Sequence, residues 1–333
     1  MPRTGFEWIA IEGFKSIRSI HVPLRQVNVL IGANGSGKSN FLEAFVFLGE
    51  ADAGRADTYV QLQGGAEKLL YYGSKTTQKI EVSADTSDMF SLIASYFSVA
   101  DDALAGAVVK GGLSLKGRSF TRYRFQDTDD HSPFKKTNQI DDNRALRSDG
   151  SNLAAFLYML RETHPGSYSL IRKTVQQAAP FFEDFQLVPL VRNRDTLKLE
   201  WRHKSSDAYF GASSFSDGTL RFIALATLFL QPAELRPQVI LVDEPELGLH
   251  PYAIELLASL IRQASVDTQV ILATQSPLLL DYFDPEDILV AEREDGATAI
   301  RRLEAEPLVE WLKEYSLGQL WEKGELAQRP VKV

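Results

Sequence analysis

Apolar and polar positions follow two different periods along the chain, and these divide it into segments of different type. Segments in which apolar and polar residues alternate, or in which β-forming residues cluster, are typical of strands. They predict strands at residues 6–14, 19–24, 27–31, 77–85, 111–127, 185–192 and 196–203. A run of four apolar residues at 239–242 predicts a strand buried on both faces, as in a parallel sheet.

An apolar spacing near 3.6 residues indicates helices in other segments. It predicts helices at residues 38–48, 151–162, 167–179 and 219–230, and one or two amphipathic helices at 306–324. The chain is therefore strand-rich at first, mixed in the middle and α/β towards its end. We predict an α/β fold.

The composition is that of an ordinary globular protein, with 44% hydrophobic and 24% charged residues in a chain of 333. Because there is no cysteine, a disulfide framework and thiolate metal sites are excluded. The longest apolar runs, such as residues 222–230, are far shorter than the roughly 20 residues of a membrane span. The N-terminal residues lack the apolar core of a signal peptide. We expect a cytoplasmic protein without membrane attachment.

The net charge of −8 argues against a uniformly basic surface for binding nucleic acid. The densest basic stretch, residues 191–204, surrounds Trp201 with Arg192, Arg194, Lys198, Arg202 and Lys204. A solvated face of a strand pair explains this stretch better than a binding patch, because a charge run alone is weak evidence.

Residues 32–39 read GANGSGKS and fit the pattern G-x-x-x-x-G-K-[ST] of a phosphate-binding loop. A predicted strand precedes the pattern and a predicted helix follows it, which is the context that the motif requires. Glycines let successive backbone N–H groups point at phosphate oxygens, and the helix start adds the positive end of its dipole. We expect the nucleotide to bind at Asn34, Gly35, Ser36, Gly37, Lys38, Ser39 and Asn40. Lys38 would reach the β- and γ-phosphates, and the Ser39 hydroxyl would ligate Mg²⁺.

A second motif, QVILVDEPELGLHP at residues 238–251, places Asp243 and Glu244 at the end of the predicted buried strand. Beside a phosphate loop, two such carboxylates have different roles. Asp243 is expected to hold Mg²⁺, directly or through water, and Glu244 to orient or deprotonate the attacking water. A kinase of the phosphate-loop class does not need the second acid, because its nucleophile arrives on the substrate.

The turn from Ser216 to Thr219, in the stretch SSFSDGTLRF, opens the apolar helix that is predicted next. By itself this turn is explained as a helix N-cap, since Ser and Asp cap well. Taken in order, the phosphate loop, this turn, the Asp-Glu strand and ILATQSP at 271–277 resemble the ABC-class ATPase heads of the SMC, RecF and OLD type. The opening IEGFKSI is also similar to the small bacterial members of that family, the AAA-family predicted ATPases.

This resemblance covers roughly residues 5–50 and 210–290, and it implies a two-lobed P-loop NTPase. A mixed-sheet lobe that binds ATP would comprise residues 1–100 and 230–300. An inserted mixed or helical lobe that carries the signature motif would comprise residues 101–229, and residues 301–333 would form a helical tail.

The resemblance also implies an ATP-dependent homodimer. In this family the Ser and Gly of the signature motif, here Ser216 and Gly218, bind the γ-phosphate held by the other subunit. The switch residue after the strand ILAT is usually His and is Gln275 here. A glutamine donates a hydrogen bond but cannot become cationic. The resemblance thus assigns catalytic roles to Lys38, Glu244 and Gln275.

A glutamine that senses Mg²⁺ and the γ-phosphate is expected between the phosphate loop and the middle of the chain. Gln61 and Gln63 are candidates, although exposed loop amides explain them equally well. We predict an ATP- and Mg²⁺-dependent ATPase that acts in DNA repair or maintenance or in phage defence, with DNA or a separate effector protein as partner. The alternative is a nucleotide-switched scaffold or regulator of a toxin–antitoxin or defence system, with negligible turnover. Glu244 favours the first, and Gln275 leaves room for the second.

Between the phosphate loop and the signature turn there are no heptads and no zinc hook, and no segment long enough for a TOPRIM nuclease follows Asp287. We therefore expect a compact head without an effector of its own.

Overall fold

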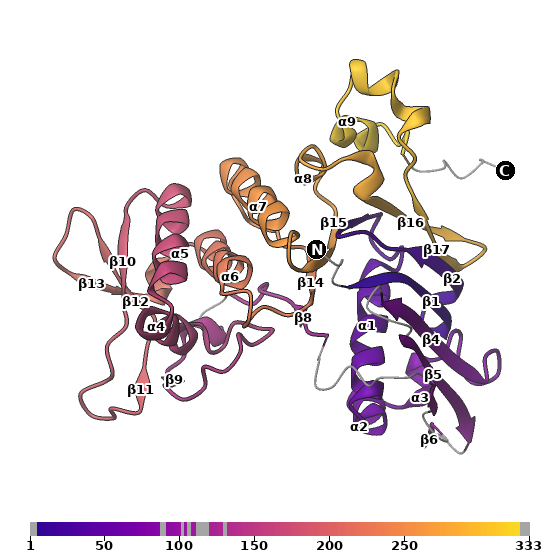
Figure 1. The fold of residues 1–333 in the computed structure, drawn as a ribbon, viewed down its shortest axis with the longest axis horizontal. Helices are drawn as coiled ribbons and strands as arrows, with labels where there is room; N and C mark the ends of the chain where they lie inside the picture. The colour runs from indigo at the N-terminus through magenta and orange to yellow at the C-terminus, as the bar shows by residue number, and fades with distance from the viewer. Residues whose placement is uncertain are drawn as a thin grey trace. The chain divides into compact units, whose positions relative to one another are not determined.

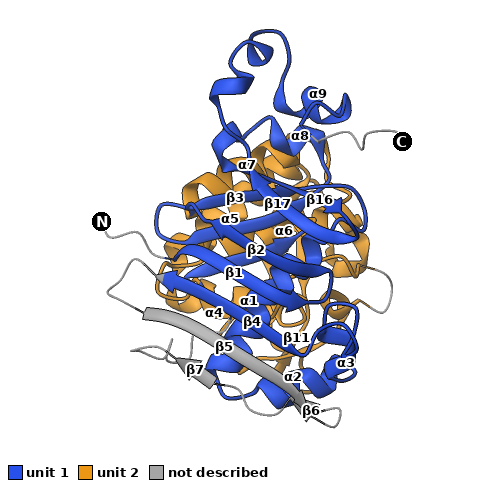
Figure 2. Ribbon diagram, turned by 90° about the vertical axis from the view of Figure 1, so that its right-hand side faces the viewer, with its two compact units in different colours: residues 1–122, 237–243, 265–333 blue, residues 123–236, 244–264 orange. Residues whose placement is uncertain are grey.

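The computed structural model describes residues 5–86, 91–100, 103–104, 108–110, 120–128 and 132–326. The chain, drawn as a ribbon in Figure 1, forms two compact units, which have different colours in Figure 2. Unit 1 comprises residues 1–122, 237–243 and 265–333, and unit 2 comprises residues 123–236 and 244–264. The chain therefore passes from one unit to the other between Asp243 and Glu244.

The described residues of unit 1 form two sheets. The first is antiparallel, in the order β2-β1-β4-β5, and two short strands pair with β5. Its strands are β1 (Phe6–Phe14), β2 (Ile17–Pro23), β4 (Lys79–Thr86), β5 (Ser91–Ala100), β6 (Ala103–Leu104) and β7 (Val108–Lys110). The second sheet is mixed, and the order of its strands in unit 1 is β17-β16-β3-β15-β14. They are β3 (Val27–Ile31), β14 (Val239–Asp243), β15 (Gln269–Thr274), β16 (Ile288–Glu294) and β17 (Ala297–Arg302). Only β17 runs antiparallel to its neighbour.

Helix α1 (Lys38–Asp52) contacts strands of both sheets and forms the centre of unit 1. Its side chains Phe41, Phe45 and Phe47 are completely buried. Burial of each such side chain contributes roughly 1.5–3 kcal/mol to stability. The core therefore holds α1, and with it the first turn of this helix, firmly in place. The other helices of unit 1 are α2 (Ala56–Leu62), α3 (Ala66–Leu69), α8 (Pro277–Leu280) and α9 (Leu317–Glu322), with 3₁₀ turns at Pro285–Asp287, Glu306–Leu308 and Trp311–Lys313.

Unit 2 is built on four helices, α4 (Leu153–Thr163), α5 (Pro165–Ala178), α6 (Asp217–Leu230) and α7 (Pro251–Ala264). Helix α5 contacts the other three, and every residue of α6 from Leu220 to Leu230 is buried. Two small antiparallel sheets complete the unit, β10-β12-β13 and β9-β11. Their strands are β9 (Asn138–Gln139), β10 (Phe182–Gln186), β11 (Thr196–Leu197), β12 (Glu200–His203) and β13 (Tyr209–Gly211). There are 3₁₀ turns at Pro133–Lys135 and Ala212–Ser214, and β8 (Arg122–Tyr123) lies where the two units meet in sequence.

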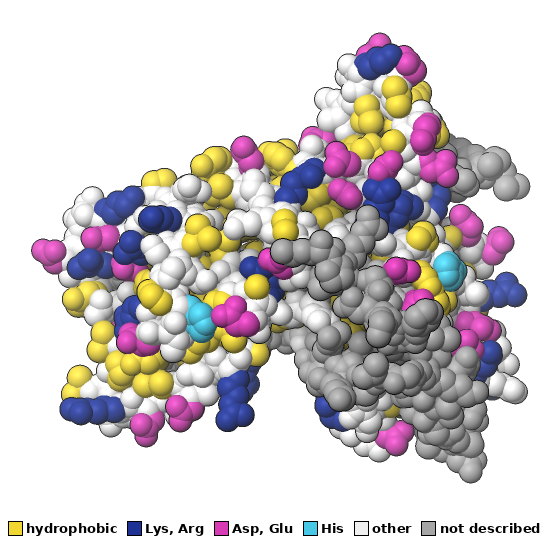
Figure 3. All heavy atoms as spheres, in the orientation of Figure 1, with side chains coloured by type: hydrophobic (Ala, Val, Ile, Leu, Met, Phe, Trp, Pro, Cys, Tyr) yellow, Lys and Arg dark blue, Asp and Glu magenta, His cyan; other side chains and the backbone are white. Residues whose placement is uncertain are grey.

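Part of the basic stretch 191–204 does form a strand pair with a solvated face. Arg202 on β12 makes an ion pair with Glu183 on β10, with 2.8 Å between Nε and Oε2. Trp201 is buried and stacks on Phe215, with 4.5 Å between ring centroids. Cationic and anionic side chains are interspersed over the part of unit 2 visible in Figure 3. The interpretation as a solvated strand pair is therefore confirmed for Arg202.

Most of the predicted elements are confirmed, with the following exceptions. The strand predicted at 185–192 ends at Gln186, because Pro189 has no N–H to donate and the chain then turns, with Leu190 bridged to Asn193. The strand predicted at 196–203 divides into β11 and β12. Of the strand predicted at 111–127, residues 111–119 lie outside the described residues. Within the described part of the chain, no helix has the length and apolar character that a membrane span needs.

Candidate functional site

The phosphate-loop motif joins β3 to α1 in unit 1, as its sequence context predicts. All five residues of β3 are buried, and α1 begins at Lys38. Gly37, directly before the helix, has a φ of 105°, in the left-handed region that other residues avoid. A Cβ atom at this position would lie 2.0 Å from Oγ1 of Thr298, so only glycine fits. The loop thus turns tightly over β17 and leads directly into the start of a long helix.

The side chain of Lys38 folds back into the loop. It is 6% exposed, and its Nζ donates to the carbonyl oxygens of Gly32 (2.6 Å) and Ala33 (3.0 Å). The hydroxyl of Ser36 is buried and has no hydrogen-bond partner among the residues that the structure describes. A buried ammonium beside an unsatisfied hydroxyl and a helix N-terminus suits an anion, so the loop fits a phosphate group.

A chain of hydrogen bonds connects the loop and the start of α1 to other segments of unit 1. The Asn40 amide donates to Oγ of Ser16 (2.7 Å), which lies 2.8 Å from Oγ1 of Thr298, and Thr298 donates to the carbonyl oxygen of Ser36 (2.9 Å). Arg293 donates to the carbonyl oxygen of Gly35 at 3.1 Å. Asn40 therefore supports the loop in this structure, and Asn34 is exposed. The sequence carried no signal for Thr298 and Arg293, which lie more than 250 residues further along the chain.

Ser39 and Asp243 lie together, as a shared metal site requires. The Ser39 hydroxyl donates to Oδ2 of Asp243 at 3.2 Å, and Asp243 is 3% exposed at the end of β14. The two residues are 204 positions apart in the chain. Hydroxyl and carboxylate oxygens are the hard ligands that Mg²⁺ prefers, so these two residues fit the cation.

Gln275 lies directly after β15, the strand between β3 and β14. Because the three strands are parallel, and Asp243 pairs with Ala273, their carboxyl ends lie at the same edge of the sheet. The side chain that caps the next helix, α8, is that of Ser276, which accepts from the Leu279 N–H. Capping therefore does not explain Gln275, and its catalytic role stays a prediction.

Two cavities lie next to each other in unit 1, and Tyr72 lines both. The first, of about 530 Å³, adjoins the loop supports and is lined by Lys15, Ser16, Asn40, Gln63, Lys68, Leu70, Tyr72 and Arg293. Of the two glutamine candidates, Gln63 thus lines this cavity, whereas Gln61 is an exposed residue of α2.

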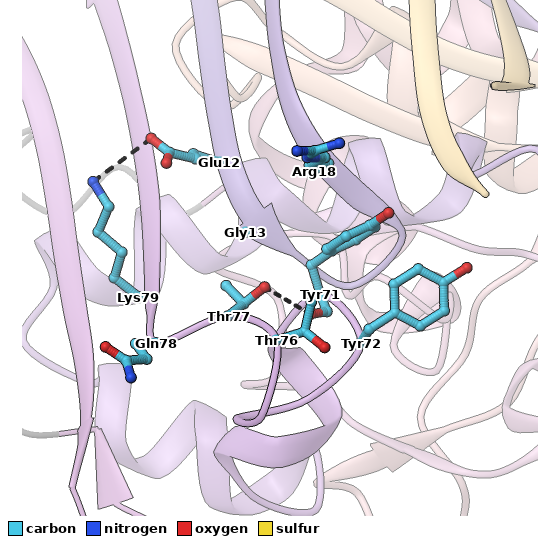
Figure 4. A pocket seen from close by; sticks show the side chains of 9 residues that line it. All are labelled: Glu12, Gly13, Arg18, Tyr71, Tyr72, Thr76, Thr77, Gln78 and Lys79. Atoms are coloured by element: carbon cyan, nitrogen blue, oxygen red, sulfur yellow. Dashed lines mark hydrogen bonds and ion pairs between the residues drawn. The ribbon is translucent and has the colours of Figure 1, made fainter. Parts of the chain in front are cut away.

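The second cavity, of about 520 Å³, is shown in Figure 4. The side chains of Tyr71 and Tyr72 lie on one side of it, and the Glu12–Lys79 ion pair lies on the other (3.6 Å). None of the predicted site residues is among the described residues that line it.

In unit 2 the predicted signature turn begins helix α6. Ser216 is the N-cap, and its Oγ accepts from the Thr219 N–H at 3.2 Å. Gly218 lies so close to the segment after Glu244 that a Cβ atom there would be 2.2 Å from the carbonyl oxygen of Gly248. The structural explanation of the turn as a helix cap is therefore confirmed, while its contact with nucleotide stays a prediction.

Glu244 has an unusual backbone and a specific side-chain partner. Its φ is +50°, which is uncommon for a residue other than glycine. Its Oε2 accepts from the Nε2 of Gln126, at 3.0 Å. Sequence reasoning missed Gln126, because it lies in a polar segment without a recognisable spacing to the other motifs. The structure thus brings Gln126 to a predicted catalytic carboxylate.

Comparison with known proteins identifies two family models. The model described as "AAA domain, putative AbiEii toxin, Type IV TA system" matches residues 95–281, more than half of the chain. A second model, described as "AAA ATPase domain", matches residues 7–154. A search of curated proteins finds no match.

Similar solved structures include several SMC heads. One, an SMC head bound to the C-winged helix domain of ScpA, has a TM-score of 0.66 and 18% identity, over 92% of this chain and 99% of that chain. The SMC head domain of Thermotoga maritima has a TM-score of 0.54 and 17% identity, over 90% and 99%. The SMC head with a coiled coil and joint from Pyrococcus yayanosii has a TM-score of 0.64 and 12% identity, over 93% and 99%. The expected P-loop ATPase head with a mixed sheet is therefore confirmed as the fold.

Proposed function

Because the chain belongs to the AAA-domain family whose description names the AbiEii toxin of type IV toxin–antitoxin systems, we propose that it is an ATPase that requires Mg²⁺ and dimerises around ATP. The observation that carries this proposal is the pairing of Ser39 with Asp243 beside the phosphate loop. A hydroxyl and a buried carboxylate, 204 positions apart in the chain, thus lie at hydrogen-bonding distance beside the loop. This pair supports the proposal because both oxygens are ligands that Mg²⁺ prefers.

The residues of the loop would bind the phosphates of ATP. Lys38 supplies a positive charge that two loop carbonyls keep in place, and Ser36 supplies a buried hydroxyl. Ser39 and Asp243 would hold Mg²⁺, which neutralises phosphate charge when bound. The cavity beside Ser16 and Tyr72 is the proposed site for the base and ribose, because it adjoins the loop and has one aromatic side chain in its wall.

Hydrolysis would depend on Glu244, which follows the metal ligand Asp243 directly. As a carboxylate it can orient a water molecule and accept its proton. Gln126 holds one carboxylate oxygen of Glu244 by a hydrogen bond, which fixes the direction of the other. Gln275, at the end of the neighbouring strand, can donate a hydrogen bond to a γ-phosphate but cannot exchange a proton as histidine can.

Measuring phosphate release tests this proposal. We expect the purified protein to release phosphate from ATP in the presence of Mg²⁺ and to stop when EDTA removes the cation. The assay is run with and without duplex DNA, and a rate increase would identify DNA as a partner. ATP binding without any phosphate release in either condition would contradict the proposed ATPase activity. It would instead support the alternative, a nucleotide-switched scaffold. The absence of a titratable group at Gln275 favours that alternative.

We also propose that Ser216 and Gly218 contact the nucleotide held by a second subunit. Ser216 is exposed at the N-terminus of α6, where the backbone N–H groups and the helix dipole attract an anion. Ser216→Arg should place a bulky side chain at this contact. In a Glu244→Gln background with ATP and Mg²⁺, light scattering should show a dimer that Ser216→Arg returns to a monomer.

The control for this dimer experiment is Ser205→Arg, an exposed serine elsewhere in unit 2, which should leave the dimer intact. Because Ser216→Arg also removes a helix cap worth about 1 kcal/mol, thermal unfolding is measured in parallel. A dimer that forms without nucleotide and persists in Ser216→Arg would contradict the sandwich.

A separate effector protein is the proposed partner of the dimer. An SMC head of similar fold was solved in complex with the C-winged helix domain of ScpA, which supports a protein as the ligand of such a head. DNA is the second candidate, and the DNA arm of the phosphate-release assay distinguishes the two.

A further inference from the structure

Arg221 is a buried cation that contacts three backbone carbonyls of unit 2. It is 4% exposed and lies in the first turns of α6, five residues after Ser216. Its Nε donates to the carbonyl oxygen of Phe125 (2.7 Å), its Nη2 to that of Gln126 (3.2 Å) and its Nη1 to that of Leu247. A guanidinium presents its donors in a rigid plane, so Arg221 fixes these carbonyls relative to one another.

The charge of Arg221 is held in a specific environment. Burial lowers the pKa of Arg221, while the carboxylates of Asp217 and Glu246 raise it. Both carboxylates belong to the segments that Arg221 connects, the start of α6 and the chain after Glu244. A buried charge is costly unless hydrogen bonds and opposite charges compensate it, and here three carbonyl acceptors and two carboxylates offset part of that cost.

Both segments whose carbonyls Arg221 contacts also form a hydrogen bond with Glu244. The side chain of Gln126 donates to the Glu244 carboxylate at 3.0 Å. The N–H of Leu247 donates to the carbonyl oxygen of Glu244 at 3.3 Å. The left-handed backbone of Glu244 is strained, so it persists only where the surroundings determine it. Arg221 thus holds the backbone of two residues that bond to Glu244.

The start of α6 also touches the same segment directly, because Gly218 leaves no room for a side chain against the carbonyl of Gly248. A movement of this turn towards residue 248 would therefore displace that segment. Arg221 extends this connection to the backbone of Gln126.

We propose that Arg221 is a positioning residue that ties the signature turn to Gln126 and Glu244, so that engagement of Ser216 and Gly218 changes the geometry of the Glu244 carboxylate. This inference rests on the proposed function, since those two residues are the proposed contacts with the partner's nucleotide. Arg221 acts only through the carbonyls it holds.

Hydrogen exchange of the full chain, followed by mass spectrometry, tests the positioning role. Arg221→Met retains the length of the side chain and removes its donors. Without nucleotide, the amides of residues 123–128 and 244–250 should exchange at least about tenfold faster in this variant, the change expected from losing a hydrogen bond to a charged group.

The matched control is Arg236→Met, which removes another arginine of unit 2 that donates to a backbone carbonyl, that of Gln231 (2.9 Å), beyond the other end of α6. It should leave both segments unchanged. If Arg221→Met fails to fold, Arg221→Lys, which keeps the charge and loses the planar fork, gives the same comparison. Unchanged exchange of both segments in the Arg221 variant would overturn the inference.

A second arm separates this inference from the proposed function. With adenylyl-imidodiphosphate and Mg²⁺, the wild type should gain protection at residues 32–40, 123–128 and 244–250, and Arg221→Met only at residues 32–40. A wild type that gains no protection at residues 32–40 would contradict nucleotide binding, while the nucleotide-free comparison would still decide the role of Arg221. Protection of all three segments in Arg221→Met would refute the coupling.

Discussion

Replacing Lys38 by alanine should weaken ATP binding at least about 100-fold. The ammonium is buried within the loop, where the carbonyls of Gly32 and Ala33 fix its position. Each hydrogen bond to a charged group contributes about 1.5–3 kcal/mol, and contacts with two phosphates would be lost together. Since about 1.4 kcal/mol corresponds to a factor of ten in affinity, a loss of two or more orders of magnitude follows. Titration with a fluorescent ATP analogue measures it directly.

Two further variants make the Lys38 result specific. Lys38→Met keeps the aliphatic chain and should lose affinity as Lys38→Ala does, because the charge carries the effect. Lys198→Ala removes an exposed lysine of unit 2 and should bind ATP normally. Circular dichroism confirms that each variant is folded. If Lys38→Ala bound ATP within about threefold of the wild type, the assignment of the loop would be wrong.

The fold was predictable from the sequence where a local pattern decides the structure. The buried strand at 239–242, the apolar helix at 219–230 and the strand–loop–helix at the phosphate motif each follow from periodicity and composition alone. The segment at 185–192 was predicted incorrectly, because its β-forming residues suggested a strand that Pro189 does not allow to continue. Strand order was beyond the sequence pattern, since β15 pairs with β14 on one side and, on the other, with β3, which lies more than 200 residues earlier in the chain.

The candidate site was predictable where its residues belong to a motif. Lys38, Ser39 and Asp243 were identified in this way, and the structure brings Ser39 and Asp243 to hydrogen-bonding distance. The sequence motifs did not identify Gln126, Thr298 or Arg221, because each of these residues acts through a contact with a distant segment. Thr298 supports the loop because β17 lies beneath Gly37, and Arg221 bonds to a carbonyl 96 residues away. Such partners follow only from the tertiary structure.

Glu244→Gln should abolish most of the turnover while leaving ATP binding intact. Glutamine has nearly the same shape, and its amide oxygen can still accept the hydrogen bond from Gln126 that Glu244 accepts now. The substitution therefore preserves the local structure and removes only the ability to accept a proton. General-base catalysis contributes about 10²- to 10⁴-fold to a rate, so phosphate release should fall by that factor. The affinity for ATP should stay within about threefold of the wild type, because nucleotide binding is assigned to the loop of unit 1.

The Lys38 and Glu244 variants should lose different properties, and this difference identifies the role of each residue. Lys38→Ala should fail to bind, whereas Glu244→Gln should bind without hydrolysis and accumulate the ATP-bound dimer. Glu255→Gln, an exposed acid on α7 in the same unit, is the control for loss of one negative charge and should turn over normally. If Glu244→Gln hydrolysed ATP as fast as the wild type, Glu244 could not be the base. The bond between Gln126 and Glu244 would then serve only to stabilise the left-handed backbone at this position, where φ is +50°.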